Sequence, residues 1–416
     1  MQSFVIERDY RRRLIRNMRN GCPVVMGRKR GRMKKLSLYV HIPFCRAKCY
    51  YCDFLSGPKY MEQKEEYVEA LCKEIGNRAQ KLSREEKIVD TIFFGGGTPS
   101  VLEDKEIKKI TDTIKKGFHV LSEAEISLEM NPDSVTKEKL KAYKEAGINR
   151  LSIGLQSANN EELKLLGRIH TWEGFLKSWN LVRKEGFSNV NIDLMSGLPG
   201  QTMESYEETL HKILKIGPEH ISSYSLIVEE GTKFEQWYGE EGEKREHLPE
   251  EETDRRMYEL TKKMLKEKGY ERYEISNYSL AGYECKHNEG YWTGKSYLGF
   301  GLGASSYFRG QRFQNENDME KYLTLMKKGE DPVLEQHTLS KKEQMEEFMF
   351  LGLRRMKGVR EKNFYERFQI SLKEVYGEKL QTLEEKALLK YNEKEGSWAL
   401  TEFGIDVSNQ VFVEFL

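Results

Sequence analysis

Three closely spaced cysteines carry the clearest chemistry in this sequence of 416 residues. Cys45, Cys49 and Cys52 have the spacing C-x3-C-x2-C, and no fourth cysteine lies nearby. Because a cubane [4Fe–4S] cluster usually takes four thiolates, three ligands on one loop leave one iron open to a small molecule. A disulfide framework is not expected, since the chain has only six cysteines and the other three are scattered singly. A structural zinc site is also disfavoured, because no second C-x2-C pair completes a set of four ligands.

Composition and charge limit the kind of protein that this chain can be. The formal net charge is +1, and no apolar run reaches the ~18 residues of a membrane-spanning helix. The sequence shows no signal peptide, and thiols kept free for a cluster indicate a reducing compartment. We therefore expect a cytoplasmic protein.

The first 35 residues form a basic arm, with twelve Lys and Arg against Glu7 and Asp9. Such an arm can bind nucleic acid or an anionic membrane surface. Peripheral membrane contact through the arm is one prediction, whereas nucleic acid is not expected as a partner because the rest of the chain is net negative. A second interpretation is favoured. Met33 runs directly into an apolar strand and resembles a natural start, so residues 1–32 form an extension that the fold does not require.

Apolar strand-like runs alternate with charged helical stretches from Leu36 onward. The expected strands are 36–41, 88–94, 126–129, 150–154, 190–195 and 221–227. The expected helices are 62–80, 104–116, 136–146, 172–184, 204–216 and 251–268, with Gly147, Gly186 and Gly269 placed to cap three of them. This alternation predicts an α/β fold with a parallel sheet. Six units make an open (β/α)6 partial barrel, short of the eight that close one.

We expect four segments along the chain. They are the basic extension 1–32, the barrel core with the cluster loop at 33–269, a mixed connecting segment at 270–340, and a C-terminal domain at 341–416. The last segment reads as four helices (341–355, 362–368, 372–376 and 380–388) followed by a short hairpin, an order that resembles a winged helix. Its 13 Lys and Arg balance 14 Asp and Glu, so no basic face for DNA is expected.

Unusual residues stand at the carboxyl ends of the predicted strands, where β/α barrels carry their functional side chains. The second strand runs into Gly95-Gly96-Gly97-Thr98. A glycine run lets a ligand approach backbone amides closely, and such amides suit a carboxylate. Glu129 and Asp193 interrupt apolar strands, and a buried acid needs a partner. A structural salt bridge explains either acid alone, whereas a nucleoside cofactor with ribose hydroxyls and an ammonium group explains both.

Together these motifs resemble the radical SAM family that contains oxygen-independent coproporphyrinogen III dehydrogenase, over the whole stretch from Leu36 to Leu416. The resemblance implies that the three cysteines hold the cluster and that S-adenosylmethionine chelates its open iron. It also implies which positions contact this cofactor: Tyr39, Tyr51, Gly96, Gly97, Thr98, Glu129, Gln156, Arg168 and Asp193.

Two features distinguish among the members of this family. The dehydrogenase carries a fourth cysteine two residues after the third, and here that position is Phe54. The run from His287 to Trp292 matches the motif H-N-x-x-Y-W of the HemW-type heme chaperones, and the run from Tyr273 to Asn277 is also typical of that branch. The resemblance therefore implies a chaperone that binds a [4Fe–4S] cluster, S-adenosylmethionine and heme and transfers heme to acceptor proteins. The coproporphyrinogen dehydrogenase, an enzyme of porphyrin biosynthesis, is the alternative.

His287 is the candidate residue for heme. Histidine is a common axial ligand of heme iron, and the flat rings of Tyr291 and Trp292 can cover a porphyrin face. Cys285 is a rival ligand only two residues away. The residues alone also fit a packed, hydrogen-bonded histidine with no ligand.

Overall fold

The computed structural model describes residues 35–416, so the predicted extension 1–32 and the predicted start at Met33 lie outside the described residues. The described chain divides into two compact units. One comprises residues 35–291 and 295–338, and the other comprises residues 292–294 and 339–416. Within the described part of the chain, no helix is both long and apolar enough to cross a membrane.

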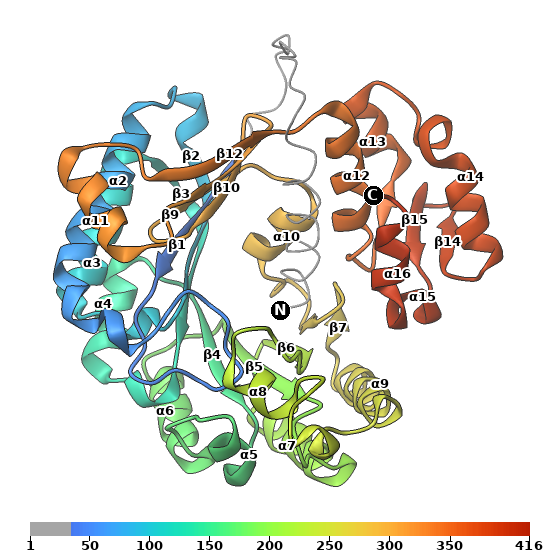
Figure 1. The fold of residues 1–416 in the computed structure, drawn as a ribbon, viewed down its shortest axis with the longest axis horizontal. Helices are drawn as coiled ribbons and strands as arrows, with labels where there is room; N and C mark the ends of the chain where they lie inside the picture. Colours follow the sequence, from blue (N-terminus) through green and yellow to red (C-terminus); the bar gives the residue numbers. More distant parts are fainter. Residues whose placement is uncertain (1–34) are drawn as a thin grey trace. The chain divides into compact units, whose positions relative to one another are not determined.

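Six parallel strands form the centre of the larger unit (Figure 1). They are β1 (Leu36–Ile42), β2 (Ile88–Gly96), β3 (His119–Met130), β4 (Arg150–Gln156), β5 (Val190–Ser196) and β6 (His220–Ser225). Each strand pairs in parallel with the next. Strand β1 also pairs with β9 (Tyr297–Phe300) and β6 with β8 (Asn277–Ser279), so the sheet does not close on itself. The predicted open (β/α)6 partial barrel is confirmed.

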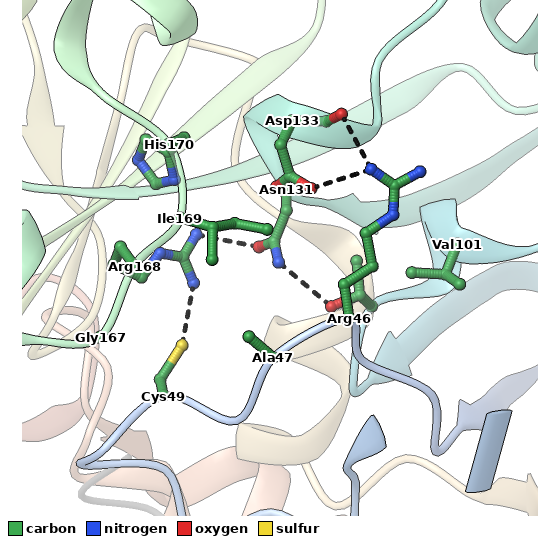
Figure 2. Close-up of a pocket in the computed structure, with 11 residues that line it drawn as sticks. Arg46, Ala47, Cys49, Val101, Asn131, Asp133, Gly167, Arg168, Ile169 and His170 are labelled. Atoms are coloured by element: carbon green, nitrogen blue, oxygen red, sulfur yellow. Dashed lines mark hydrogen bonds and ion pairs between the residues drawn. The ribbon is translucent and has the colours of Figure 1, made fainter. Parts of the chain in front are cut away.

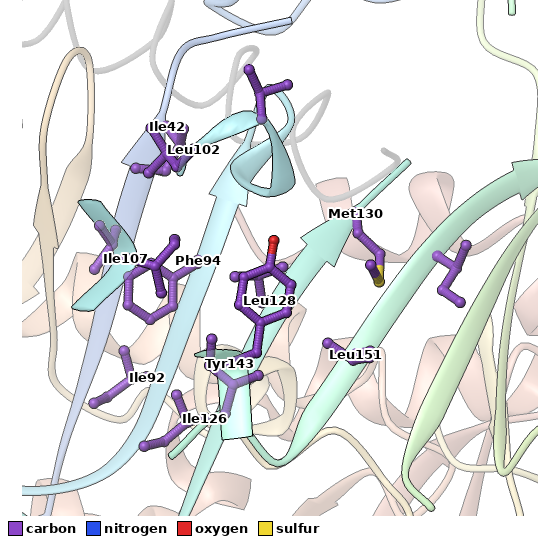
Figure 3. Packing of buried hydrophobic residues seen from close by; sticks show 14 of the residues in the cluster. Ile42, Ile92, Phe94, Leu102, Ile107, Ile126, Leu128, Met130, Tyr143 and Leu151 are labelled. Carbon is purple, nitrogen blue, oxygen red and sulfur yellow. The ribbon is translucent and has the colours of Figure 1, made fainter. Parts of the chain in front are cut away.

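Side chains alternate between the two faces of these strands. On the outer face, Phe94 and Leu128 pack against Ile107 and Tyr143 of the covering helices, as Figure 3 shows. All four side chains are fully buried. The inner face carries the other set, which is largely polar: Tyr39, Thr91, Glu129, Ser152, Asn191, Asp193 and His220. The acids that interrupt the apolar pattern thus belong to a polar inner face.

The six expected crossover helices are present, each within two residues of the predicted ends. They are α2 (Lys64–Gln80), α3 (Asp104–Gly117), α4 (Lys137–Ala146), α6 (Trp172–Lys184), α7 (Met203–Ile216) and α9 (Glu251–Glu267). Gly147, Gly186 and Gly269 follow three of them with φ of 93°, 78° and 83°, the left-handed conformation that glycine adopts without a Cβ clash. Two six-residue helices, α5 (Asn160–Leu165) and α8 (Lys233–Tyr238), were not expected because they are too short to show a helical period.

Strand β3 is longer than the predicted strand 126–129. It begins at His119, and its first half pairs with Ile88 and Val89 of β2. Residues 119–123 are polar or partly exposed, so they lack the apolar run that marks a buried parallel strand.

Six short strands come from residues 270–340, the predicted mixed segment. They are β7 (Glu271–Arg272), β8, β9, β10 (Ser305–Phe308), β11 (Gln311–Asn315) and β12 (Val333–Thr338). Helices α10 (Lys286–Trp292) and α11 (Met319–Lys328) lie between them. Strands β9 to β12 extend the sheet beyond β1.

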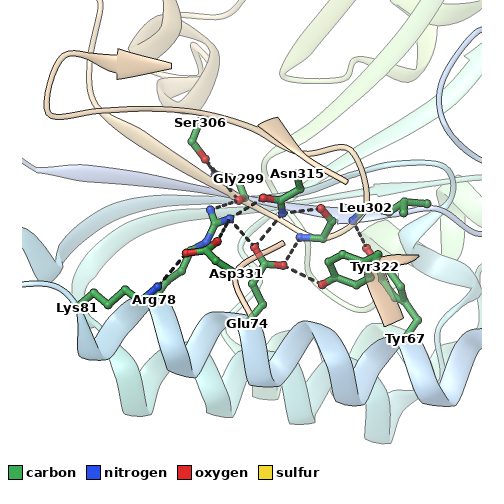
Figure 4. Close-up of polar contacts among 11 residues, drawn as sticks. Tyr67, Glu74, Arg78, Lys81, Gly299, Leu302, Ser306, Asn315, Tyr322 and Asp331 are labelled. Atoms are coloured by element: carbon green, nitrogen blue, oxygen red, sulfur yellow. Dashed lines mark hydrogen bonds and ion pairs between the residues drawn. The ribbon is translucent and has the colours of Figure 1, made fainter. Parts of the chain in front are cut away.

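A buried polar cluster fixes this extension to α2 (Figure 4). The carboxylate of Glu74 accepts hydrogen bonds from Tyr322, Asn315 and the amide of Gly301, each at 2.8–2.9 Å. It also forms an ion pair with Arg78 at 3.1 Å. Because both carboxylate oxygens of Glu74 are hydrogen-bonded and its charge is paired with Arg78, the charged residues are tolerated inside the core.

The smaller unit contains the C-terminal helices and a small sheet. Its helices are α12 (Lys341–Gly352), α13 (Glu361–Phe368), α14 (Leu372–Glu385), α15 (Glu402–Asp406) and α16 (Ser408–Val413), and its strands are β13 (Val359–Arg360), β14 (Leu389–Asn392) and β15 (Ser397–Leu400). The predicted helices 372–376 and 380–388 are one helix, α14. Gly377 lies within it, with no atom near the position of a Cβ. The hairpin of β14 and β15 occurs around the predicted turn.

Candidate cofactor site

The cysteine loop leaves the carboxyl end of β1 and is tied at once to the glycine run after β2. The amide of Gly97 donates to the carbonyl of Ile42 and that of Thr98 donates to the carbonyl of Phe44, both at 2.8 Å. Phe44 is fully buried, with its ring against Tyr67 at a centroid distance of 5.3 Å. These contacts fix the chain immediately before Cys45.

The three thiols of the loop lie close together and close to hydrogen-bond donors. Thr98 Oγ1 donates to Cys45 Sγ at 3.5 Å, and Arg168 Nη1 donates to Cys49 Sγ at 3.4 Å. Burial, against the lowering effect of the Lys48 ammonium and together with the neighbouring thiols of Cys49 and Cys45, raises the pKa of Cys52 to about 11. Donors near sulfur stabilise thiolates, which are the form that binds iron.

These residues fit an iron–sulfur cluster. Between Lys35 and Leu416, no three His, Cys, Asp or Glu groups surround a single metal-ion position. A cubane differs from such a site, because each of its cysteines binds a different iron. The thiols of Cys72 and Cys285 lie elsewhere, on α2 and just before α10.

A hydrogen-bonded chain of side chains connects the loop to the ends of three strands (Figure 2). Arg168 Nη2 donates to Asn131 Oδ1 at 2.9 Å and to the carbonyl of Gly154. Asn131 Nδ2 in turn donates to Thr98 Oγ1 at 3.2 Å. A pocket beside Cys49 is lined by these side chains and by Ile169, whose side chain is 55% exposed. The predicted site residues Thr98 and Arg168 are therefore connected at one edge of the sheet, through Asn131.

The glycine run has a different role from the one expected. The amides of Gly97 and Thr98 donate to the cysteine loop, and that of Gly96 donates to Glu129 Oε2 at 3.1 Å. No amide of Gly96, Gly97 or Thr98 is thus left for a ligand carboxylate. A Cβ on Gly97 would lie 2.7 Å from the carbonyl oxygen of Phe44 and 2.8 Å from that of Ile42. Gly96 has φ of 109°, and a Cβ there would collide with the ring of His41. The run is needed for close packing against the loop.

Glu129 and Asp193 place two carboxylates on the inner face near this edge. Burial, followed by the charge of Asp193, raises the pKa of Glu129 to about 8. Burial also raises the pKa of Asp193, although Asn191 donates to Asp193 Oδ1 at 2.7 Å. Two neighbouring acids with raised pKa values favour a cationic group between them.

Two tyrosines complete the predicted set at this edge. Tyr39 is hydrogen-bonded through its hydroxyl to His41 Nδ1 at 3.1 Å, and His41 Nε2 donates to the carbonyl of Leu55 at 3.0 Å. Tyr51 is buried, and its ring meets Phe234 at 6.2 Å. His41 and Asn131 were not predicted as site residues. His41 lies two positions after Tyr39, and Asn131 lies two positions after Glu129. Because side chains two apart along a strand point to the same face, this spacing was the signal that could have found them.

Gln156 adopts a strained backbone at the end of β4. Its φ is 76°, and the register with β5 shifts between Gly154 and Gln156. Its side-chain nitrogen lies 3.1 Å from the position of a Cβ on Gly154, and Arg168 Nη2 lies 3.4 Å from the same point. Strain of this kind in a non-glycine residue is typical of a functional site.

The histidine motif lies at a separate position. His287 is 1% exposed, with its Nδ1 3.1 Å from Thr91 Oγ1 and its Nε2 2.9 Å from the hydroxyl of Tyr291. Cys285 is fully buried, and its Sγ donates to Glu125 Oε1 at 3.6 Å. Thr91 and Glu125 stand well before the ends of β2 and β3, so His287 does not join the residues at the cysteine loop. Both candidate heme ligands are occupied by protein partners in this structure.

Similarity to known proteins identifies the family. The Radical SAM superfamily matches residues 39–213, and the HemN C-terminal domain matches residues 339–407. The chain is 40% identical over 381 residues to the heme chaperone HemW of Bacillus subtilis (strain 168), which covers 91% of this chain and 99% of that relative. This chain belongs to the HemW family. The resemblance predicted from the motifs is confirmed.

Further relatives agree with membership in the HemW family. The heme chaperone HemW of Lactococcus lactis subsp. lactis (strain IL1403) is 37% identical over 383 residues, 92% of this chain and 98% of that relative. Among solved structures, coproporphyrinogen III oxidase (HemN) from Escherichia coli, a radical SAM enzyme, has a TM-score of 0.79 at 24% identity. The match covers 92% of this chain and 90% of that one, and it shows that this chain shares its fold with HemN.

Proposed function

We propose that this chain is a cytoplasmic heme chaperone. It holds a [4Fe–4S] cluster on Cys45, Cys49 and Cys52, binds S-adenosylmethionine beside the cluster, binds heme, and transfers heme to acceptor proteins. The observation that carries the proposal is that two of the three thiols on one loop, those of Cys45 and Cys49, accept hydrogen bonds from Thr98 and Arg168 at the carboxyl ends of the strands. A cluster of this kind, when bound with S-adenosylmethionine, supplies one-electron chemistry.

The chain's own residues would hold S-adenosylmethionine by charge and hydrogen bonds. Glu129 and Asp193 face a cofactor that carries an ammonium group, a sulfonium group and ribose hydroxyls, and positive charge beside two buried acids lowers their pKa values. Arg168 is a permanent cation that suits the carboxylate of the same cofactor. The walls of this site are completed by Tyr39, Tyr51 and Gln156. The remaining predicted positions contribute through backbone amides, which hold the cysteine loop (Gly97 and Thr98) and Glu129 (Gly96) in place.

The heme-binding part of the proposal is supported by the relatives, which are named heme chaperones, and by the chemistry of α10. This helix provides an imidazole beside aromatic rings, with Phe93 and Tyr291 at centroid distances of 5.1 and 5.0 Å from the ring of His287. Phe54 provides no fourth thiol, which speaks against the dehydrogenase reaction.

A heme titration under anaerobic conditions tests the proposal. The cluster-reconstituted protein should bind heme in a stoichiometric ratio and should then lose it to an apo-globin used as a probe acceptor. It should not convert coproporphyrinogen III to protoporphyrinogen IX with S-adenosylmethionine and a reductant present. Robust decarboxylation by the wild type would replace the chaperone by the dehydrogenase, and failure to bind heme would refute the proposal.

A further inference from the structure

A continuous chain of hydrogen bonds, buried at its centre, leads from Asp193 to the start of α10. Asn191 Nδ2 donates to Asp193 Oδ1 at 2.7 Å, and Asn191 Oδ1 lies 2.6 Å from His220 Nδ1. His220 Nε2 lies 2.8 Å from the hydroxyl of Tyr273, which accepts from the amide of Cys285 at 3.2 Å. Four hydrogen bonds thus join an acid of the proposed S-adenosylmethionine site to the residue just before the motif helix.

The direction of every hydrogen bond in this chain is determined. The amide oxygen of Asn191 is only an acceptor, so Nδ1 of His220 must carry the hydrogen. Burial lowers the pKa of His220 well below its ordinary value, so the ring is neutral and its Nε2 accepts from Tyr273. The amide of Cys285 donates to Tyr273, and Asn191 donates to Asp193. All four bonds donate toward Asp193, an arrangement in which each bond strengthens its neighbours.

The central residues of the chain have no access to water as an alternative partner. His220 is 0% exposed and Asn191 is 2% exposed. Asn191 Nδ2 also donates to Ser152 at 2.7 Å, and Asn191 Oδ1 also accepts from Ser222 at 3.1 Å. The amide is therefore held from both sides, and a shift of Asp193 is transmitted to His220 because a lost bond cannot be replaced by solvent.

This chain gives a role to the run Tyr273–Asn277, which the site residues at the cysteine loop leave unexplained. The run forms the turn between β7 and β8, closed by a bond from the amide of Tyr273 to the carbonyl of Asn277 at 3.2 Å. Glu274 accepts from the amide of Ser276 at 3.2 Å and from Asn277. The turn is thus rigid, and it holds the hydroxyl of Tyr273 between His220 and Cys285.

The start of α10 is anchored at a second point. Glu125 accepts from the amides of Lys286 and His287 at 3.0 and 3.1 Å. Tyr273 and Glu125 therefore bind three consecutive amides at the first turn of the helix that carries His287. Any change at Tyr273 alters one of the two supports of that turn.

We propose that Asn191, His220 and Tyr273 are positioning residues, which orient Asp193 for its ligand and couple that orientation to the first turn of α10. The inference rests on the proposed function, because it takes S-adenosylmethionine as the ligand of Asp193. Coupling between two sites is reciprocal. Binding of S-adenosylmethionine therefore orders the start of α10, and a change in α10 weakens the binding of S-adenosylmethionine.

The test uses the full-length, cluster-loaded protein and two measurements. Calorimetry gives the affinity for S-adenosylmethionine, and hydrogen–deuterium exchange with mass spectrometry follows the backbone amides of residues 283–291. In the wild type, S-adenosylmethionine should slow exchange in this segment. Tyr273→Phe removes one hydroxyl from the chain. It should lower the affinity for S-adenosylmethionine up to about tenfold, the usual effect of losing one buried hydrogen bond. It should also abolish the protection of residues 283–291 from exchange.

Tyr143→Phe is the matched control. Tyr143 lies on α4, where it packs in the hydrophobic core on the outer side of the sheet, and its buried hydroxyl has no hydrogen-bond partner among the described residues. This variant should keep the wild-type affinity and the wild-type protection. His220→Phe interrupts the same chain at another point and should repeat the effect of Tyr273→Phe.

Three outcomes would overturn the inference. Tyr273→Phe and His220→Phe could both retain wild-type affinity and wild-type protection, which would leave the chain a purely structural network. The wild type could bind S-adenosylmethionine without any change in exchange at residues 283–291, which would exclude coupling while the proposed function stands. A wild type that does not bind S-adenosylmethionine at all would refute the proposed function itself, and the inference with it.

Discussion

The Nε2 atom of His287 lies 2.9 Å from the phenol oxygen of Tyr291, one turn further along α10. The other ring nitrogen faces the hydroxyl of Thr91, which donates its own hydrogen to Ser37 at 2.8 Å. Nδ1 therefore carries the ring hydrogen, and Nε2 accepts from Tyr291. Burial lowers the pKa of His287 to about 3, so the imidazole is neutral, the form that binds iron.

Removing the hydroxyl of Tyr291 should favour heme binding through His287. In the wild type, iron can bind Nε2 of His287 only after the hydrogen bond from Tyr291, worth about 1 kcal/mol, is broken. Tyr291→Phe removes this cost, so heme affinity should rise about fivefold. A heme titration followed by absorbance measures this. His287→Ala should weaken heme binding or change its spectrum. If His287→Ala keeps the wild-type spectrum and Cys285→Ala changes it, Cys285 is the axial ligand.

The cysteine assignment predicts a sharp difference among single replacements. Cys45→Ala, Cys49→Ala or Cys52→Ala each removes one ligand and should abolish the iron–sulfur absorbance. Cys72→Ala is the matched control, because Cys72 lies on α2 and should keep the iron and sulfide content of the wild type. Equal loss of iron in Cys72→Ala and Cys49→Ala would show that the three-cysteine assignment is wrong.

Gly97→Val should disrupt the cysteine loop as well as the binding of S-adenosylmethionine. Its Cβ would press on the carbonyl oxygens of Phe44 and Ile42, which precede Cys45. We expect loss of the cluster and a lower urea midpoint. Gly76→Ala is the control: nothing lies near its Cβ position within α2, so it should stabilise the protein by about 0.5–1 kcal/mol. A Gly97→Val protein with full iron content would contradict this role of the glycine.

Glu129 should make the cofactor-free protein less stable as pH rises. Burial and then Asp193 raise the pKa of Glu129 from 4.5 to about 8. Between these values the folded chain holds a proton that the unfolded chain has released, so the free energy of unfolding falls with increasing pH. Glu129→Gln should flatten this dependence in urea unfolding across the same window. Glu65→Gln, at an exposed carboxylate of α2, should keep the wild-type slope, and an unchanged slope in Glu129→Gln would rule out the buried acid as its cause.

Much of the barrel could be predicted because its elements follow local patterns. Strand-like runs of five or six residues, at 36–41, 150–154 and 190–195, predicted β1, β4 and β5, and glycines at helix ends predicted the caps at Gly147 and Gly186. Strand β3 could be predicted only in its second half. Its first half is polar, and it becomes a strand because β2 offers partners, which is a tertiary interaction.

The residues that could do chemistry were also visible in the sequence, but their arrangement was not. The spacing of Cys45, Cys49 and Cys52 predicted the kind of cluster, because ligand type and number decide what iron centre a loop can hold. Only the fold decided that Arg168 would reach Cys49, and that the amides after β2 would bind the cysteine loop rather than a ligand.

The sequence by itself thus determined the chemistry that each segment carries, since residue type and local spacing are properties of the chain. The tertiary structure decided which of these segments meet. It buried His287 against Thr91 and away from the cysteine loop, and it linked Asp193 to Tyr273 through Asn191 and His220. Hydrogen bonds between residues far apart in the sequence depend on how parallel strands bring their side chains to one face, and no local pattern encodes that.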